Sequence, residues 1–365
     1  MFFSLLKSDQ VGRYKDIAWV LFKHGGRELV DHFGFGEVVD DEWVDGEQTV
    51  NAEELADDLE RLGPTFVKLG QVLSSRADLL PMPYLKALSR LQDEVEPFAY
   101  EEVERIVVEE FGAAPSELFA TFEVEPMAAA SLGQAHRATL AGGQRVVVKI
   151  QRPGIRERVQ NDLDALHQIA RWIDEHSELG RRYHFLSTIR QFRRSLMREL
   201  DYTREADNLR TLSHNLEEFE KIVVPAPIDE LCSGRVLTMQ WMDGCKITEI
   251  TPEQRTQVDG NALLDELFHA YLKQVLQDGF FHADPHPGNV LLTRRGRVGI
   301  IDLGMVGHLD ESLQESLLNL LIAVSEGRSD DAADLAMSVG DSSEVFDPKT
   351  FRSGMREVLS EHREQ

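Results

Sequence analysis

Hydrophobic positions along the chain repeat with two different periods. In the first third, apolar residues at helical spacing predict an amphipathic helix over residues 10–25, a helix over 51–62 and two more within 83–112. From Thr121 the apolar residues alternate instead, in TFEVEP, AHRATL and QRVVVKIQRP, with the short stretches MAAASLGQ and AGG between them. This change of period predicts a helical N-terminal part followed by a small antiparallel sheet.

The rest of the chain combines long helical tracts with short strands. Helical spacing runs over residues 153–218, with a break near Gly180, and again over 252–279. Strand patterns return in IVVPAPIDEL, in GRVLTMQW and on both sides of a turn at 294–296, and the segment from Glu311 onward is helical. A sheet followed by a helical body predicts an α+β fold.

The formal charge of the chain is strongly negative. Aspartate and glutamate total 64 against 39 lysines and arginines, which gives −25, and the acidic residues are spread along the whole chain. Nucleic-acid binding depends on basic patches, so this balance argues against a nucleic-acid partner. An acidic surface stays soluble where salt screens its self-repulsion, and we interpret it as adaptation to a very saline cytoplasm, as in a haloarchaeon.

Other features indicate a cytoplasmic protein. No apolar run reaches the about 20 residues that a membrane helix needs, and the apolar start is too short for a signal peptide. The two cysteines, Cys232 and Cys245, lack metal-ligand spacing, and a disulfide framework is not expected. The amphipathic helix over 10–25 could dock on its own protein or on a membrane; its polar face is poor in Lys and Arg, which favours docking. Residues 31–50 are predicted to form an acidic loop.

The stretch FFHADPHPGNVLL places polar and structure-breaking residues between two apolar segments. Two interpretations compete. His282, Asp284 and His286 alternate as metal ligands on a strand would, but the prolines between and beside them exclude a regular strand, and a closed site lacks an obvious fourth ligand. In the other interpretation the stretch is a catalytic loop that depends on Asp284 and Asn289.

The kinase interpretation explains more residues at once. Phosphoryl transfer needs an acceptor near the attacking hydroxyl, oxygen ligands for Mg²⁺ and a cation on the phosphates. Asp284 and Asn289 supply the first and part of the second, and Asp302 in IIDLG supplies a further oxygen ligand. Lys149 in VVVKI stands where a phosphate-pairing lysine stands. These four residues in this order predict a protein-kinase-like fold.

A kinase also needs a carboxylate that holds this lysine, and the tract RELDYTREADN offers three. Glu199 and Asp201 are two residues apart, so on a helix they do not share a face. Glu205 is our choice for the partner of Lys149.

At these motifs the sequence resembles the UbiB-like family of atypical kinases, which is linked to ubiquinone biosynthesis. FVKLGQ matches the K-x-G-Q element of that family at Lys68 and Gln71, and ELDYTREADN carries its E-x-D pair, Glu199 and Asp201. MAAASLGQ matches its alanine-rich loop, which stands where ordinary kinases have a glycine-rich loop. Ordinary kinases lack the K-x-G-Q and E-x-D elements, so these two are the most diagnostic.

The resemblance implies a two-lobe protein-kinase-like fold with an antiparallel N-lobe sheet, a helical C-lobe and N-terminal helices packed over the active site. Residues 1–115 are then the helical extension, 116–242 the N-lobe with inserted helices and 243–365 the C-lobe. Gly70 would let the K-x-G-Q helix lie close to another backbone in the kinase lobes. Members of the family commonly continue further and often end in transmembrane helices, so we expect either a short member or a chain that is incomplete at its C-terminus.

The resemblance also implies ATP and Mg²⁺ as ligands, with Asn289 and Asp302 on the metal and Asp284 facing the nucleophile. The residues expected to contact the nucleotide are Ala128, Ala129, Ala130, Ser131, Lys149, Gln240 and Met242. The family further implies a lipid or quinone-precursor ligand and a peripheral membrane contact.

Two other functions remain open. HADPHPGNVLL also resembles the catalytic loop of aminoglycoside and choline phosphotransferases, which act on small molecules. A third interpretation is a non-catalytic module that binds nucleotide and docks on a partner. Lys149, Asn289 and Asp302 would suffice for that role, whereas Asp284 argues for chemistry.

Overall fold

The computed structural model describes most of the chain, namely residues 8–25, 52–74, 76–77, 80–91, 95–177, 180, 184–256, 258–340 and 346–363. The acidic loop predicted at 31–50 lies outside these residues. The chain forms two compact units, Met1–Thr203 with Ile228–Thr238 and Arg204–Pro227 with Met239–Gln365. The three-part division with boundaries after residues 115 and 242 stays a prediction.

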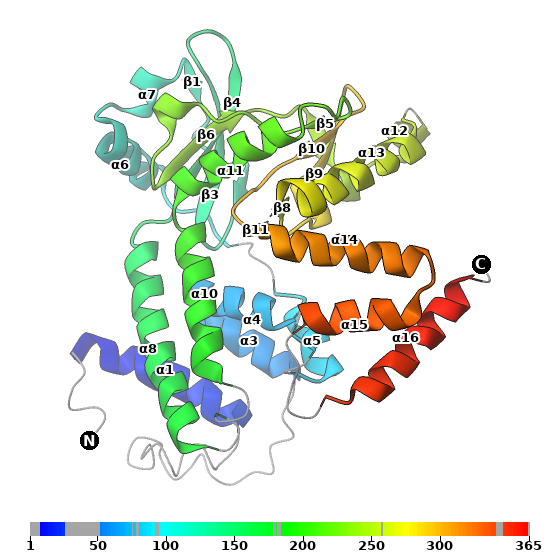
Figure 1. The fold of residues 1–365 in the computed structure, drawn as a ribbon. Helices are drawn as coiled ribbons and strands as arrows, with labels where there is room; N and C mark the ends of the chain where they lie inside the picture. Colours follow the sequence, from blue (N-terminus) through cyan, green and yellow to red (C-terminus); the bar gives the residue numbers. More distant parts are fainter. Residues whose placement is uncertain are drawn as a thin grey trace. The chain divides into compact units, whose positions relative to one another are not determined.

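The first unit contains the helices of the N-terminal part of the chain (Figure 1). They are α1 (Ser8–Gly25), α3 (Ala52–Leu62), α4 (Pro64–Ser74), α5 (Met82–Leu88), α6 (Tyr100–Phe111), α7 (Pro115–Leu118), α8 (Ile155–His176) and α10 (Phe185–Glu199). Proline at the first position of α4 and left-handed Gly112 after α6 mark a helix start and a helix end. The predicted break near Gly180 separates α8 from α10, which run side by side. A large buried core that includes Phe66, Leu88 and Leu163 joins α1, α3, α4, α5, α8 and α10.

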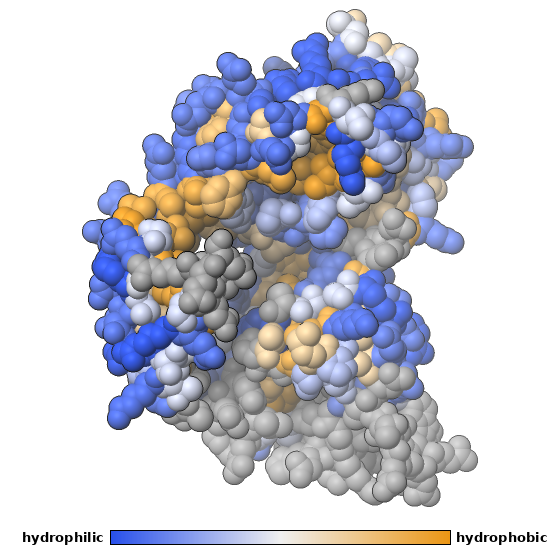
Figure 2. Space-filling view, turned by 90° about the vertical axis from the view of Figure 1, so that its right-hand side faces the viewer, coloured by the Kyte–Doolittle hydropathy of each residue, from blue (hydrophilic) through white to orange (hydrophobic). Residues whose placement is uncertain are grey.

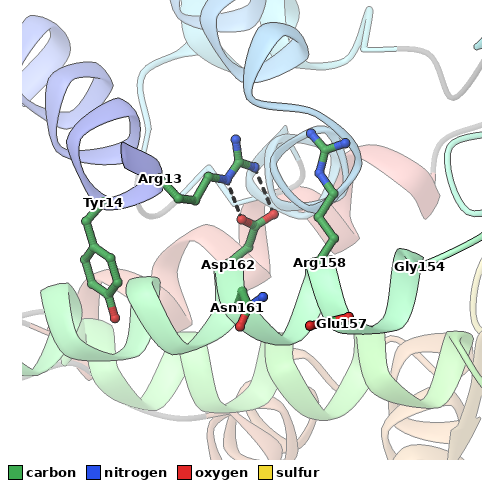
Figure 3. Close-up of a pocket in the computed structure, with 7 residues that line it drawn as sticks. All are labelled: Arg13, Tyr14, Gly154, Glu157, Arg158, Asn161 and Asp162. Atoms are coloured by element: carbon green, nitrogen blue, oxygen red, sulfur yellow. Dashed lines mark hydrogen bonds and ion pairs between the residues drawn. The ribbon is translucent and has the colours of Figure 1, made fainter. Parts of the chain in front are cut away.

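Helix α1 docks on this core, as its amphipathic pattern predicted. Tyr14, Ile17 and Val20 are buried at helical spacing and belong to the shared core. On the polar side, Arg13 forms a two-pronged ion pair with the buried Asp162 of α8, with Nε to Oδ1 at 2.6 Å and Nη2 to Oδ2 at 2.9 Å (Figure 3). Apolar contacts and an ion pair therefore both hold α1 on the core.

The sheet of the first unit is built from β1 (Thr121–Phe122), β2 (Ala128–Ala129), β3 (Gly133–Thr139), β4 (Arg145–Gln151) and β6 (Val236–Gln240). The strand order is β1-β3-β4-β6, and β2 also pairs with β3. Val146, Val148 and Ile150 are fully buried at alternate positions of β4 and pack in one cluster with residues of α6. The prediction that the alanine stretch only interrupts the sheet was wrong, because two of its residues form a strand.

The second unit has twelve α-helices and β-strands in its described residues, and the first of them, α11, begins at the end of the first unit. They are α11 (Tyr202–Asn215), β5 (Ile222–Val223), β7 (Gly244–Lys246), α12 (Pro252–Thr256), α13 (Gly260–Lys273), β8 (Phe280–His282), β9 (Val290–Thr293), β10 (Val298–Ile300), β11 (Val306–His308), α14 (Glu311–Ser325), α15 (Ser329–Val339) and α16 (Pro348–Arg363). One sheet has the order β5-β10-β9-β7, and β8 pairs with β11. The predicted strands around the turn at 294–296 are β9 and β10, an antiparallel pair.

The helix predicted over 252–279 is interrupted twice. Thr251 caps α12, since its Oγ1 accepts the N–H of Gln254 at 3.3 Å, but Asp259 caps a second helix by accepting the N–H of Ala262 at 3.1 Å. After α13 the backbone widens into a π-helical segment, Gln274–Asp278. The cap at Asp259 explains why the helix is interrupted between α12 and α13. Among the helices that the structure describes, none has the length and apolar character to cross a bilayer.

Candidate active site

The polar stretch of residues 280–292 is held in place by hydrogen bonds to its own backbone and to neighbouring elements. The short strand β8 ends at His282, and the next residue, Ala283, donates its N–H to the carbonyl of Met305 at 3.1 Å. The chain then turns through a 3₁₀ segment, Pro287–Asn289, directly into β9. The prolines thus form a fixed turn between two strands.

His282 lies beneath this turn and is 3% exposed. Its backbone N–H donates to Oε1 of Gln274 at 3.1 Å, and its ring Nδ1 accepts the N–H of Asp284 at 3.1 Å. Burial lowers the pKa of His282, and the nearby carboxylates of Asp302 and Asp284 oppose this shift. A neutral ring with its proton on Nε2 fits these contacts, through which His282 orients the loop.

The metal-cluster interpretation finds no support in these contacts. Nδ1 of His286 accepts the N–H of Gly288 at 3.0 Å, so both histidines direct Nδ1 to the loop backbone. In the part of the chain that the structure describes, no group of three or more His, Cys, Asp or Glu side chains could hold a metal ion together. Cys232 and Cys245 do not form a disulfide with each other.

Asn289 and Asp302 lie at the same end of the β9–β10 hairpin. The N–H of Ile301 donates to the carbonyl of Asn289 at 2.9 Å, which places Asp302 one residue beyond this bond. Nδ2 of Asn289 donates to the carbonyl of Asp284 at 3.3 Å. An amide oxygen and a carboxylate on adjoining backbone positions are the hard oxygen ligands that Mg²⁺ takes in phosphoryl-transfer sites. The two residues therefore fit the metal that the kinase interpretation requires.

Asp302 has an unusual backbone conformation. Its φ is 64°, in the left-handed region that residues other than glycine seldom occupy. Its Oδ1 accepts the N–H of Gly304 at 3.3 Å, and Nδ2 of Asn208 on α11 donates to the carbonyl of Leu303 at 2.8 Å. These bonds hold the IDLG turn in a conformation that costs about 1–3 kcal/mol, and strain of this kind often marks functional sites.

In the first unit, Lys149 lies in a row across three strands. Lys149 of β4 stands opposite Ala135 of β3, and Ala135 stands opposite Ala128 of β2. Residues directly opposite each other in antiparallel strands point to the same face of the sheet. The alanine strand therefore lies two strands away from Lys149 and on the face to which the lysine points, as a covering for phosphate groups requires.

The alanine-rich loop closes on itself through Gly133. The N–H of Ala130 donates to the carbonyl of Gly133 at 2.7 Å, and Ser131 between them is buried. Ala128, Ala129 and Ala130 are absent from the residues with positive φ, in keeping with their Cβ atoms, which disfavour the conformations that glycine adopts freely.

The K-x-G-Q and E-x-D elements meet in the first unit through one ion pair. Nζ of Lys68 on α4 lies 2.9 Å from Oε1 of Glu199, the last residue of α10. Gln71 donates from Nε2 to the carbonyl of Leu91 at 3.2 Å. Asp201 accepts at Oδ1 from the hydroxyl of Thr203 at 2.6 Å, near the start of α11.

Two predictions about this region were wrong. Glu199 and Asp201 do not occupy one helix, because α10 ends at Glu199 and α11 begins after Asp201. Gly70 does not meet another backbone. A Cβ at this position would meet the side chains of Leu91, Leu59 and Leu88, which belong to the packing of α3 and α5 around α4.

The remaining candidate residues lie in the second unit. Glu205 is buried on α11, whereas Lys149 belongs to the first unit, and the pair between them stays a prediction. Gln240 donates its N–H to the carbonyl of Ala226 at 2.8 Å. Met242 follows on the segment between β6 and β7.

Three residues that position the site were not identified from the sequence. Asn208 and Gln274 are polar residues inside helices, and helical spacing alone does not show that they hold the IDLG turn and the backbone of His282. Gly133 has ordinary φ, so a turn pattern does not reveal it. A Cβ there would lie 2.5 Å from the carbonyl oxygen of Ile150 and 2.7 Å from the hydroxyl of Tyr202.

Comparison with known proteins identifies the family. Residues 90–336 match the model of the ABC1 atypical kinase-like domain, which is more than half of the chain. The chain belongs to this family. An ABC1 chain has a kinase-like α+β fold, in agreement with the antiparallel sheet and the helical body described above.

Several ABC1 relatives are similar over most of this chain. The chloroplastic protein ACTIVITY OF BC1 COMPLEX KINASE 8 of Arabidopsis thaliana is 39% identical over 296 residues, which cover 80% of this chain and 39% of the relative. The probable protein kinase UbiB of Marinobacter nauticus is 38% identical over 269 residues, which cover 73% and 49%. The chain thus spans less than half of the length of these two relatives.

A solved structure is also similar to this ABC1 chain. It is the complex of Rv3197 with erythromycin from Mycobacterium tuberculosis, with a TM-score of 0.56 and 26% sequence identity, and the match covers 85% of this chain and 78% of that one. The predicted resemblance to UbiB-like proteins and the predicted fold class are confirmed.

Proposed function

We propose that this protein is an atypical kinase or ATPase that binds Mg²⁺-nucleotide and either hydrolyses ATP or transfers its γ-phosphate. The proposal rests on one observation: Asn289 and Asp302 lie at the same end of the β9–β10 hairpin, and Asn289 is hydrogen-bonded to the backbone of Asp284. Two hard oxygen ligands at adjoining backbone positions are the donors that Mg²⁺ takes, and strained backbone such as that at Asp302 often marks functional sites.

Each side chain has a role in this proposal. Mg²⁺-ATP, when bound, supplies a phosphoryl group whose negative charge the metal partly neutralises. Asp284 orients the attacking hydroxyl or water and accepts its proton, and its backbone N–H is already held by His282. Asn289 and Asp302 hold the metal, and the surrounding hydrogen bonds keep their backbone in place before nucleotide arrives.

The first unit contributes the cation and the covering strand. Lys149 binds the α- and β-phosphates and is held by Glu205. Ala128, Ala129, Ala130 and Ser131 cover the phosphates; the first two form the short strand β2 and the other two the turn after it, in place of a flexible glycine loop. Gln240 and Met242 contact the adenine. The ion pair between Lys68 and Glu199 fixes the K-x-G-Q helix at the end of α10, where the E-x-D element begins.

The acceptor belongs to isoprenoid quinone or membrane-lipid metabolism in this proposal. Support comes from similarity to a probable protein kinase UbiB and from the K-x-G-Q and E-x-D elements of that kind of protein. We propose a lipid or quinone-precursor ligand and a peripheral membrane contact on the same grounds.

A small-molecule phosphotransferase is the second candidate. The similar structure from Mycobacterium tuberculosis was solved with erythromycin, which is a small molecule with hydroxyl groups. A screen of soluble alcohols separates the two candidates, because turnover of one of them far above background ATP hydrolysis supports the phosphotransferase.

The test of the nucleotide site compares Asp302→Asn with Asp284→Asn in molar KCl. We expect Mg²⁺-dependent thermal stabilisation by ATP and ADP in the unchanged protein, because a ligand that binds only the folded state raises its stability. Asp302→Asn should lose this stabilisation. Asp284→Asn should keep it, while its ATP hydrolysis falls by about 10²-fold or more.

Each outcome decides one point. A hydrolysis rate unchanged in Asp284→Asn would remove Asp284 from the chemistry and favour the non-catalytic binding module. A stabilisation unchanged in Asp302→Asn would remove Asp302 from the metal site. Asp310→Asn serves as the control, since its carboxylate caps α14 through the N–H of Leu313.

A further inference from the structure

A second pocket lies in the first unit, among residues that have no role in the proposed kinase chemistry. Its volume is about 440 Å³, within the range of small-molecule sites. The residues that line it come from α1 and from the start of α8, and they are Arg13, Tyr14, Gly154, Glu157, Arg158, Asn161 and Asp162. In Figure 3, Arg13 reaches in from α1 and Arg158 rises from α8, with Asp162 between them.

Both oxygens of the buried carboxylate in this pocket, that of Asp162, already accept hydrogen bonds. Asp162 is 1% exposed, and both of its oxygens accept from Arg13. Its Oδ2 also accepts the hydroxyl proton of Thr65 at 2.6 Å. The charge of Asp162 therefore balances Arg13 and is not available for a second cation.

Arg158 adds a positive charge that no ion pair among the described residues neutralises. Nη2 of Arg158 donates to the carbonyl of Leu62 at 3.3 Å, and Nη2 of Arg13 donates to the same oxygen at 2.6 Å, so the two guanidinium groups converge. Among the described residues, Arg158 forms no ion pair with a carboxylate. Just before α8, burial lowers the pKa of Arg152, and the nearby charge of Arg158 adds to this shift. Such a convergence of positive charges is unexpected in a chain with a formal charge of −25.

We propose that this pocket binds an oxyanion of the phosphate class. Arg158 is the principal contact, because a guanidinium presents a planar fork that fits two oxygens of a phosphate. The outward-facing part of Arg13 and the side chain of Asn161 complete the site. The ligand is a soluble phosphate compound or the phosphate headgroup of a lipid, and both present the same chemistry to the two arginines.

The proposal includes one opposing group. Glu157 lines the pocket, is exposed and carries a negative charge, so it weakens anion binding. This gives a test in both directions. Loss of the charge of Arg158 should weaken binding, and loss of the charge of Glu157 should strengthen it.

The probe is inorganic pyrophosphate in EDTA at constant ionic strength, measured by thermal shift and by titration calorimetry. Without divalent metal, binding at the proposed kinase site is disfavoured, and Asp302→Asn should respond as the unchanged protein does. We expect pyrophosphate to stabilise the unchanged protein, Arg158→Gln to bind at least tenfold more weakly and Glu157→Gln to bind more tightly. Arg156→Gln is the matched control, because Arg156 lies in the same first turns of α8 but does not line the pocket.

Absence of stabilisation in the unchanged protein, or equal affinity in Arg158→Gln, would overturn the proposal. If Arg158→Gln does not fold, Arg158→Lys keeps the charge without the planar fork and should still bind more weakly. Flotation with vesicles that contain phosphatidic acid, against vesicles of phosphatidylcholine alone, identifies the source. Flotation lost in Arg158→Gln assigns the site to a lipid headgroup, and flotation unchanged in this variant assigns the pyrophosphate site to a soluble ligand.

Discussion

At the scale of single residues, His136 shows how hydrogen bonding decides a protonation state. Its ring is fully buried in the N-lobe sheet, where Nδ1 lies 2.8 Å from the carbonyl of Glu123 and Nε2 lies 2.9 Å from Nε2 of Gln134. Oε1 of Gln134 accepts the N–H of Phe98, which fixes the amide so that its nitrogen faces the histidine. Nδ1 therefore donates and Nε2 accepts, and a second proton would have no acceptor.

This arrangement predicts a pH dependence of stability. Burial lowers the pKa of His136 below its usual 6.5, although the carbonyl and charge of Glu123 oppose the shift. The unfolded chain then binds a proton that the folded chain does not, so the free energy of unfolding should fall as the pH drops below about 6.5. The loss should level off below the folded-state pKa.

The measurement is the free energy of unfolding between pH 5 and pH 7. His136→Gln should reduce its slope by up to about 1.4 kcal/mol per pH unit. His269→Gln, an exposed position on α13, is the control and should leave the slope unchanged. A slope unaffected by His136→Gln would show that protonation of this ring does not cause the pH dependence of stability.

Gly133 gives a second prediction at this scale. A methyl group there would overlap the carbonyl oxygen of Ile150 and the hydroxyl of Tyr202, and the carbonyl belongs to β4, beside Lys149. Gly133→Ala should therefore destabilise the protein by about 1–3 kcal/mol in denaturant unfolding. Gly142→Ala, in the turn between β3 and β4 where a Cβ meets no atom within 4 Å, should change stability far less. Similar losses in both variants would contradict the close approach.

At the scale of elements, α1 depends on a buried charge. Removing the charge of Asp162 leaves Arg13 without its partner in a partly buried place, which typically costs about 3–5 kcal/mol. We expect Asp162→Asn to release α1 and to increase proteolysis of the chain near its N-terminus. Asp164→Asn is the matched control on the same helix, because its ion pair with Arg193 is exposed and should contribute no more than about 1 kcal/mol. Proteolysis that rises equally in both variants would rule out the role of Asp162.

The elements also show how far sequence patterns reach. Helical spacing located most of the long helices, because each buries one stripe of apolar side chains. It missed the interruption before α13, since the cap at Asp259 is a single side-chain bond within a continuous apolar pattern. Strands of two residues, such as the alanine strand β2, are too short for any alternation to be seen.

For the candidate site, the sequence indicated which residues carry the chemistry but not which distant residues hold them in place. Lys149, Asp284, Asn289 and Asp302 were found because kinase chemistry needs those residue types in that order. The ion pair between Lys68 and Glu199 joins helices far apart in the sequence, and only the resemblance to a family pointed to it. The end of α10 at Glu199 was not foreseen, because it depends on tertiary bonds such as that between the N–H of Tyr202 and the carbonyl of Gly234.

At the scale of the whole molecule, surface charge is the property that can be predicted most directly from the sequence. Most of the described surface on the face in Figure 2 is hydrophilic, with scattered apolar patches. The formal charge is −25, with 64 aspartates and glutamates against 39 lysines and arginines. Exposed carboxylates that repel one another destabilise the folded state unless ions screen them.

This charge predicts a strong effect of salt. The screening length falls from about 10 Å at 0.1 M to about 3 Å at 1 M ionic strength, so the free energy of unfolding at pH 7 should rise steeply over this range of KCl. The same titration near pH 5 is the control. The sequence isoelectric point is about 4.9, so little net charge remains to be screened there and the salt effect should be small. Equal salt effects at both pH values would indicate a general effect of KCl on hydrophobic burial, and stability that falls with KCl at pH 7 would contradict adaptation to a saline cytoplasm.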